Sequence, residues 1–257
     1  MTGEELDPVE AQAVAAGFGV AVEQVRRDHL ISHILAALSR AHRDQLIFFG
    51  GTALARTHLP NGRLSEDIDL IALGPRTDVA AAVERTLTSA LRRSHGVTRW
   101  SPTLTDVRDT DAAVLLADDG RLAIRIQLLD QRGYEPWPTE ISTLDQRYRD
   151  APPATLRVPT VAAFAAWKTV AWHHRSAPRD LFDLWALARR GHITAQAAHL
   201  FAAHGPTGRP PRPWMFATAP PEQRWRQQLA TQTRLTVTAA NALSVVSQAW
   251  ADASSNL

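Results

Sequence analysis

The sequence predicts an α/β (α+β) protein of two lobes, with a mixed sheet in the N-terminal lobe and a mostly helical C-terminal lobe. In the first part of the chain, short apolar runs that are typical of buried strands alternate with segments of helical periodicity. The strand signals fade at a proline-containing segment, DAPPATLRVP (150–159), and helical spacing takes over. We therefore expect one lobe over residues 1–155 and a second over residues 156–257.

The first lobe is expected to open with helices. A short helical segment precedes residues 23–41, whose apolar side chains recur at helical spacing. LIFF (46–49) is an apolar run that ends at Gly50 and predicts a buried strand. TALARTHL (52–59) is then a helix opened by the glycines, and IDLIAL (68–73) predicts a second strand.

Two further elements complete this lobe. Residues 77–93 have an amphipathic pattern, and Thr77 is a suitable N-cap for a helix there. Residues 112–130 contain two strand-like runs on either side of Asp119-Gly120, a frequent turn sequence. They predict a β-hairpin.

The second lobe is expected to be helical. Residues 160–175 and 178–190 predict two helices, with Ser176 as the cap of the second and Gly191 at its end. Residues 205–221 are too rich in proline for a regular element and predict a long loop. The remaining helices are expected over the segments EQRWRQQLATQTR and TAANALSVVSQAW.

Composition excludes several classes of protein. The 257 residues contain no cysteine, which excludes disulfides, zinc–thiolate sites and thiol nucleophiles. The first residues lack the pattern of a signal peptide, and no apolar stretch reaches the roughly 18 residues that span a bilayer. We expect a soluble, cytoplasmic protein that does not interact with membranes.

Charge is distributed unevenly along the chain. Residues 151–257 have an excess of basic side chains and residues 1–150 an excess of acidic ones, although the formal net charge is only +2. A basic surface on the second half would suit a polyanion, unless the arginines are scattered at random. Lys168 is the one lysine among 28 basic residues. A compact ammonium suits a tight phosphate site in which a guanidinium does not fit, unless this lysine survives by chance.

Two features near the first strands indicate chemistry. Gly50 and Gly51 lie between a strand and a helix, where backbone N–H groups can bind an anion, although such a pair is more often a plain tight turn. Asp67 and Asp69 lie two residues apart on a strand, so both carboxylates project from one face and repel each other. A divalent cation such as Mg²⁺ between them favours the pair, whereas the simpler explanation is a solvated strand edge. Together the two features favour a metal–nucleotide site.

These motifs resemble those of a known family. The stretch GGTALAR…LPNGRLSEDIDL resembles the first two motifs of the AbiEii/AbiGii family, a toxin branch of the polymerase-β-like nucleotidyltransferases that includes the MenT toxins. VEQVRRDHLISHILAAL is similar to the helix before the family's first strand, and WKTVAWHHRSAPRDLFDL is similar to its lysine motif and the Arg-Asp motif that follows. The resemblance spans roughly residues 20–190 and implies a polymerase-β-like fold in the first lobe.

The resemblance implies a role for particular residues of this sequence. Those in the first lobe would hold the triphosphate (Gly50, Gly51, Thr52), lie near the nucleotide (Arg56, Arg63, Ser65) and bind Mg²⁺ or Mn²⁺ (Asp67, Asp69). In the second lobe, Lys168 would contact the phosphates, while Arg179, Asp180 and Asp183 would complete the site. For Asp180, a helix-capping or dipole role is equally compatible with the sequence.

One departure from the wider superfamily concerns the metal ligands. A third carboxylate usually stands on a later strand, but RLAIRIQLLD (121–130) offers Arg125 and Gln127 at alternating positions and an acid only at Asp130. Either Asp67, Asp69 and Asp183 suffice, or a single metal is held.

The implied reaction is transfer of a nucleoside monophosphate from an NTP, with Asp183 as general base. The basic half favours an RNA acceptor, and Trp214 and Trp225 would either stack on bases or anchor the structure. The resemblance implies that the acceptor is the 3′ end of tRNA, so that translation is blocked, and that a cognate antitoxin exists. Two further hypotheses are nucleotidyl or phosphoryl transfer onto a protein hydroxyl, and a nucleotide-binding regulator without turnover.

Histidines do not suggest a metal site. His173 and His174 are adjacent on a predicted helix, where their side chains point about 100° apart. The remaining histidines are scattered along the sequence without the spacing of a zinc motif.

Overall fold

The structure is a computed structural model that describes residues 6–132 and 137–255. The chain forms two compact units, the first comprising Met1–Tyr134 and Glu140–Val158, and the second Glu135–Thr139 and Pro159–Leu257. The predicted α/β class is confirmed, because one unit contains a mixed sheet and the other is helical.

Seven strands in the described part of the chain form one sheet in the order β3-β4-β5-β2-β1-β7-β6. β2 is antiparallel to β1 and parallel to β5, so the sheet is mixed as expected. The predicted hairpin is confirmed as the antiparallel pair β4–β5. The strand bounds are Leu46–Phe49 (β1), Asp67–Ala72 (β2), Arg99–Trp100 (β3), Ala112–Ala117 (β4), Leu122–Asp130 (β5), Thr139–Thr143 (β6) and Thr155–Pro159 (β7).

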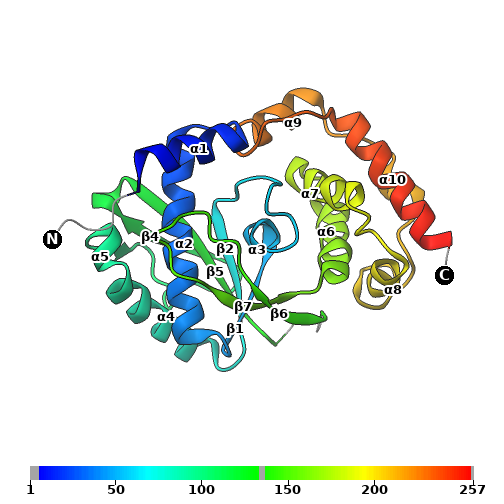
Figure 1. Ribbon diagram of the computed structural model, residues 1–257. Coiled ribbons are helices and arrows are strands. Elements are labelled where there is room, and N and C mark those ends of the chain that lie inside the picture. The colour runs from blue at the N-terminus through cyan, green and yellow to red at the C-terminus, as the bar shows by residue number, and fades with distance from the viewer. Residues whose placement is uncertain (1–5, 133–136, 256–257) are drawn as a thin grey trace. The chain divides into compact units, whose positions relative to one another are not determined.

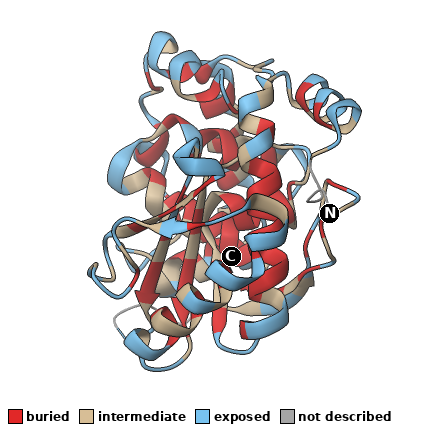
Figure 2. Ribbon diagram, turned by 90° about the vertical axis from the view of Figure 1, so that its left-hand side faces the viewer, coloured by how far each residue is buried: buried red, intermediate tan, exposed pale blue. Residues whose placement is uncertain are grey.

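Helices α2 and α4 pack against each other and against β5 of the sheet (Figure 1). Most residues of α2 are buried, and Figure 2 shows buried residues running through the strands of the sheet. This burial includes polar side chains of α2, which must find partners inside the protein. The helices of this unit are Pro8–Phe18 (α1), Val22–His42 (α2), Gly50–Arg56 (α3), Arg76–Ala90 (α4) and Arg92–His95 (α5).

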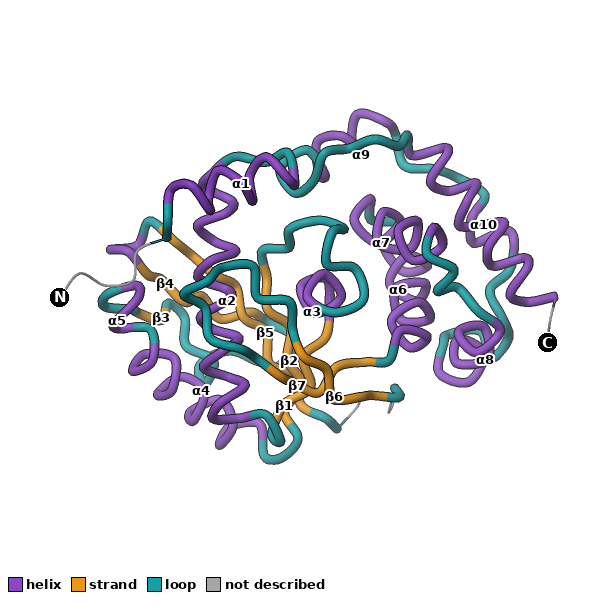
Figure 3. Tube along the Cα trace, viewed as in Figure 1, coloured by secondary structure: helices purple, strands orange, loops and turns teal. Residues whose placement is uncertain are grey.

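In the helical second unit, two buried tryptophans donate hydrogen bonds to the backbone. Trp172 Nε1 donates to the carbonyl of Met215 at 2.8 Å, and Trp225 Nε1 donates to that of Val237 at 2.9 Å. The predicted loop over residues 205–221 is confirmed, interrupted by a single 3-10 helix, Pro213–Phe216 (Figure 3). The α-helices are Val161–Arg175 (α6), Pro178–Arg189 (α7), Ala195–His204 (α8), Glu222–Leu229 (α9) and Ala239–Ser255 (α10). Among the described residues, no helix has the length and apolarity to cross a membrane.

Two predicted caps are wrong. α4 begins at Arg76 after Pro75, so Thr77 lies inside its first turn. Ser176 does not begin α7 but ends α6, in a left-handed conformation with φ 45°. α7 instead has Pro178 in its first turn, where a missing N–H costs nothing. The end of α7 at Gly191 is confirmed, since this glycine has φ +70° and its N–H donates to the carbonyl of Ala188.

Candidate functional site

The turn between β1 and α3 is built against the acidic pair on β2. Phe49 pairs with Asp69 across the antiparallel strands, and Gly50 follows with φ +79°. A Cβ atom on Gly50 would lie 1.9 Å from Asp69 Oδ2, so any side chain there would displace the Asp69 carboxylate. Glycine at position 50 therefore allows both the positive φ and the close approach of the Asp69 carboxylate to the backbone.

The rest of this turn is in contact with the loop that precedes β2. A Cβ atom on Gly51 would lie 2.6 Å from Arg63 Nη2 and 3.0 Å from Ser65 Oγ. The Thr52 hydroxyl donates to the backbone carbonyl of Asp67. The structure thus brings together most of the residues that the sequence marks in the first lobe, including the buried Arg63. We call this set the turn cluster: Gly50, Gly51, Thr52, Arg63, Ser65, Asp67 and Asp69.

Asp67 and Asp69 project from the same face of β2, because the intervening Ile68 is fully buried and both aspartates are partly exposed. On the parallel neighbour β5, Arg125 pairs with Asp67 and Gln127 pairs with Asp69. Arg125 Nε lies 4.0 Å from Asp67 Oδ1. The guanidinium on the neighbouring strand therefore reduces the repulsion between the two acids.

Asp130 is not near this pair. It pairs with Ala72 at the other end of β2. Hydrogen bonds from the side chain and backbone of Arg132 lower the pKa of Asp130 to about 2. Asp130 therefore belongs to a local ion pair at the opposite end of the strand, and it supplies no third ligand to Asp67 and Asp69.

Arg56 is not brought to the turn cluster. Its side chain is fully buried, and Nη2 lies 2.9 Å from Asp28 Oδ1 on α2. Arg147 Nη1 lies 3.2 Å from the same oxygen, and the Tyr148 hydroxyl donates to Asp28 Oδ2 at 2.9 Å. Burial lowers the pKa of Arg56 to about 10, and the Asp28 carboxylate opposes this by raising it. Arg56 is thus part of an internal ion pair that joins α3 to α2.

Replacing Arg56 with alanine should lower the free energy of unfolding by about 3–5 kcal/mol, because Asp28 would lose a buried partner. Urea denaturation of the purified variant measures this. Arg43→Ala removes an exposed arginine paired with Asp44 and should cost less than about 1 kcal/mol. An Arg56→Ala protein that unfolds like the parent but loses NTP affinity would return Arg56 to the nucleotide site.

In the second unit, Lys168 lies between two aspartates. Its Nζ atom is 2.7 Å from Asp183 Oδ2 and 3.3 Å from Asp180 Oδ1. Asp180 also accepts from Arg175, at 2.6 Å from Nε and 2.9 Å from Nη2. Asp180 and Asp183 lie three positions apart on α7, so both face Lys168 on α6. We call Lys168, Arg175, Asp180 and Asp183 the lysine cluster.

The lysine cluster balances buried charge. Asp180 is fully buried, and Lys168 and Asp183 are 8% and 4% exposed. Burial would raise the pKa of Asp180, but Lys168 and Arg175 outweigh it and hold the pKa below its usual value. Arg179 also lies on α7, but it is exposed and is not part of this set. The turn cluster lies wholly in the first unit and the lysine cluster wholly in the second.

The two tryptophans considered for base stacking differ. Trp225 is fully buried and donates to a backbone carbonyl, so it is a core anchor and cannot stack on a base. Trp214 is 60% exposed and contacts the His173 ring edge-on, with centroids 5.3 Å apart. Only Trp214 stays a candidate for contact with a nucleic acid.

Sequence reasoning missed one group of polar residues. The histidines are not all scattered, because His29 and His33 of α2 meet at Asp150. The signal was the spacing of four positions, which places two side chains on one face of a helix. The partner Asp150 lies far away in the sequence and gives no such signal.

The chain is similar to known proteins in sequence and in fold. Residues 33–252 match the model of a family described as nucleotidyl transferase AbiEii toxin, type IV TA system. No curated protein sequence matches the chain. Among solved structures, the nucleotidyltransferase toxin MenT4 from Mycobacterium tuberculosis H37Rv is similar, with a TM-score of 0.73, 23% identity, and coverage of 96% of this chain and 89% of that chain. A candidate nucleotidyltransferase from H. pylori is also similar, with a TM-score of 0.57, 13% identity, and coverage of 93% and 97%.

Proposed function

The chain belongs to the AbiEii family of nucleotidyl transferase toxins of type IV toxin–antitoxin systems, and we propose that it transfers a nucleoside monophosphate from an NTP onto the 3′ end of tRNA. The attacking hydroxyl oxygen of the tRNA would bond to the α-phosphorus while the bond to pyrophosphate breaks. A nucleotide added at this end blocks translation, because the 3′ end carries the amino acid. The proposal places the reaction in the cytoplasm and implies a cognate antitoxin.

The contact between Gly50 and Asp69 carries the proposal. A backbone turn that suits phosphate and a carboxylate that suits a metal are packed against each other at the end of β1. A metal-bound triphosphate needs both groups at one place. A plain tight turn would not require a carboxylate at the position of the missing Cβ atom.

Asp67 and Asp69 fit a divalent cation, Mg²⁺ or Mn²⁺, because two partly exposed carboxylates on one strand face form an oxygen donor set. When bound, the ion would neutralise phosphate charge and lower the pKa of the attacking hydroxyl. The remaining groups of the turn cluster would orient the triphosphate, through the backbone N–H groups of Gly51 and Thr52 and the hydroxyl of Ser65. Arg125 beside Asp67 favours a site with fewer protein carboxylates than the superfamily's usual three.

We assign Lys168, Asp180 and Asp183 of the lysine cluster to the same reaction from the family's motifs. Lys168 would bind the nucleotide phosphates, and the carboxylates of Asp180 and Asp183 hold its ammonium within 3.3 and 2.7 Å. Asp183 would accept the proton of the attacking hydroxyl. Arg179, on the exposed side of α7, would contact the nucleotide more peripherally.

Exposed arginines of the second unit would bind the tRNA backbone. Phosphate contacts of this kind make affinity fall with salt, since each neutralised phosphate releases counterions. Arg226 is not counted among them, because it pairs with Glu222 at 3.1 Å. The arginines that we assign to this surface, all of them exposed, are Arg189, Arg190, Arg209, Arg212 and Arg224.

Incubation with total tRNA and each α-³²P-labelled NTP tests the proposal. We expect label in tRNA, dependence on Mg²⁺ or Mn²⁺, and sensitivity of the label to exonuclease from the 3′ end. Label in protein would support transfer onto a protein hydroxyl, and transfer of label in a parallel incubation with γ-³²P-labelled NTPs would indicate phosphoryl transfer. NTP binding without any transfer would support a nucleotide-binding regulator, a function that an arginine beside Asp67 in place of a third carboxylate would suit.

Charge reversal separates the acceptor surface from the nucleotide site. The triple change of Arg209, Arg212 and Arg224 to glutamate should weaken tRNA binding at least tenfold and flatten its salt dependence, with NTP affinity unchanged. Filter binding over a range of salt concentrations measures both. If the reversed protein labels tRNA at the normal rate, these arginines are not part of the acceptor surface.

A further inference from the structure

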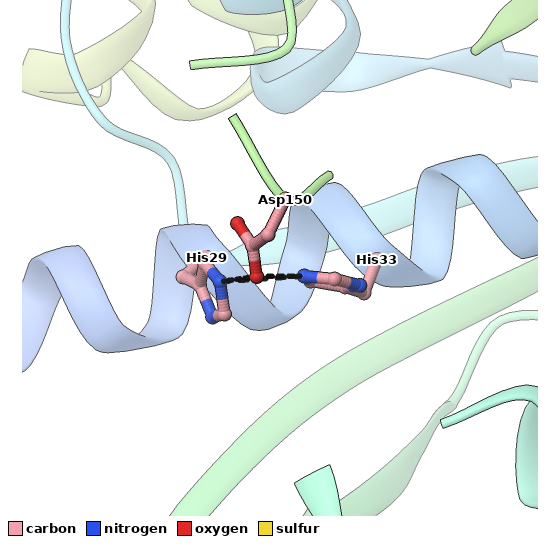
Figure 4. Close-up of side chains that lie close together, drawn as sticks. All are labelled: His29, His33 and Asp150. Atoms are coloured by element: carbon pink, nitrogen blue, oxygen red, sulfur yellow. Dashed lines mark hydrogen bonds and ion pairs between the residues drawn. The ribbon is translucent and has the colours of Figure 1, made fainter. Parts of the chain in front are cut away.

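A second group of metal-ligand side chains lies in the first unit, on residues that the proposed transfer reaction does not use. His29 and His33 project from one face of α2, and Asp150 reaches them from the segment before β7 (Figure 4). Asp150 Oδ2 lies 2.9 Å from His29 Nε2 and 3.1 Å from His33 Nε2. The two Nε2 atoms are 3.3 Å apart. Three atoms of ligand type therefore converge on one point.

The spacing of these atoms is that of ligands around one small cation. In a tetrahedral zinc site with Zn–N bonds of about 2.0–2.1 Å, neighbouring ligand atoms lie about 3.3 Å apart. The observed separations of 2.9, 3.1 and 3.3 Å come close to this value. An ion could therefore be held after side-chain shifts of a few tenths of an ångström, with the backbone in place.

The carboxylate has bonding capacity to spare. Asp150 Oδ1 is buried and has no hydrogen-bond partner among the residues that the structure describes. A buried acceptor without a partner costs free energy unless an unseen group satisfies it. A cation bound through both carboxylate oxygens would supply that group, whereas the hydrogen bonds to the two histidines use only Oδ2.

A third histidine, His95, contacts the second ring nitrogen of His29. His95 Nε2 lies 3.2 Å from His29 Nδ1, and His95 Nδ1 lies 2.9 Å from Ser94 Oγ. When His29 binds a metal through Nε2, its proton sits on Nδ1 and can be donated to His95. Metal-binding histidines are oriented by such a hydrogen bond on the second ring nitrogen.

One of the three side chains, His33, borders a surface cavity. A surface cavity of about 350 Å³ is lined by His33 together with Ala37, Ser94 and Pro152. Water in it could occupy the coordination position that three protein ligands leave open.

We propose that His29, His33 and Asp150 bind a zinc ion, with His95 as the residue that orients His29. Two imidazole nitrogens and one carboxylate suit Zn²⁺, whereas Mg²⁺ prefers a shell of oxygen ligands. The chain has no cysteine, so histidine and carboxylate are the zinc ligands it can offer. The ion would fasten α2 to the segment before β7, since Asp150 lies 121 positions from His29 and 117 from His33.

Direct metal titration tests the proposal on the full chain. The chelator-treated protein carries Asp67→Ala and Asp69→Ala, so that the carboxylates of the proposed nucleotide site contribute no binding. We expect one equivalent of Co²⁺ to bind with the intense visible absorption of a four-coordinate site, Zn²⁺ to displace it, and Mg²⁺ to leave it in place. If no stoichiometric Co²⁺ or Zn²⁺ binding occurs at micromolar concentration, the proposal is wrong, whatever the transfer assay shows.

Single variants locate the ion. His33→Gln and Asp150→Asn should abolish the Co²⁺ absorption, and His95→Gln should weaken zinc binding by about tenfold or more. His42→Gln is the matched control, because His42 is a buried histidine of the same helix whose ring nitrogens hydrogen-bond to Gln45 and Thr86. Circular dichroism checks that each variant is folded. Undiminished binding by folded His33→Gln and Asp150→Asn proteins would place the ion elsewhere and refute this site.

Discussion

Replacing Asp67 or Asp69 with alanine should reduce nucleotide transfer by about a thousandfold or more, with the fold intact. Loss of a metal ligand removes several kcal/mol of charge stabilisation in the transition state, and each 1.4 kcal/mol is about tenfold in rate. Stability should change little, because the two carboxylates repel each other and neither is fully buried. Single-turnover labelling of tRNA and urea denaturation measure the two quantities on the same protein.

The structure supplies a matched control for this pair. Asp130→Ala removes an acid from the neighbouring strand β5. Asp130 pairs with Ala72, at the end of β2 away from Asp67, and accepts a hydrogen bond from Arg132. Transfer by this variant should stay within about twofold of the parent, since an exposed ion pair contributes little. Near-normal activity of Asp67→Ala or Asp69→Ala with Mg²⁺ would show that the metal is held elsewhere. Equal losses in all three variants would indicate a general effect of acidic charge.

Local sequence patterns predicted the part of the site that local geometry builds. LIFF followed by two glycines indicates a strand that turns into a helix, and alternation around Ile68 placed both aspartates on one face. The sequence also predicted the later strand on which Arg125 and Gln127 stand at alternating positions. The sequence did not show that the Asp69 carboxylate lies where a side chain at position 50 would begin. That contact depends on the register of β1 with β2.

Long-range contacts account for the features that were missed. β7 contains Pro159 and follows a proline-rich stretch, so it resembles a linker, yet Arg157 pairs in parallel with Ile47 of β1. Arg56 has the sequence position of a nucleotide ligand, but its partner Asp28 lies 28 positions earlier on α2. Burial of Trp225 and the meeting of His29 with Asp150 are of the same kind. Each is decided by a partner that no local pattern identifies.

Lys168→Arg should lower the rate of transfer by about a hundredfold or more, although the positive charge is kept. Lys168 Nζ fits between Asp180 and Asp183 at 3.3 and 2.7 Å in a position that is only 8% exposed. A guanidinium is broader and planar, and it cannot take the place of an ammonium in this space. Displacing one preorganised charge from a developing phosphate charge costs about 10²–10³ in rate.

The same contacts offer a structural explanation for Lys168, and paired measurements separate the two. If the lysine only neutralises Asp180 and Asp183, Lys168→Arg should alter the free energy of unfolding while the NTP dissociation constant and the transfer rate of the folded fraction stay normal. If it binds the phosphates, both NTP affinity and transfer rate should suffer even where the protein is folded. Arg175→Lys is the control, because Arg175 is the second cation on Asp180 but is 63% exposed, so a lysine can replace it with little strain. A folded Lys168→Arg protein as active as Arg175→Lys would remove Lys168 from the nucleotide site and leave it as the counterion of two buried carboxylates.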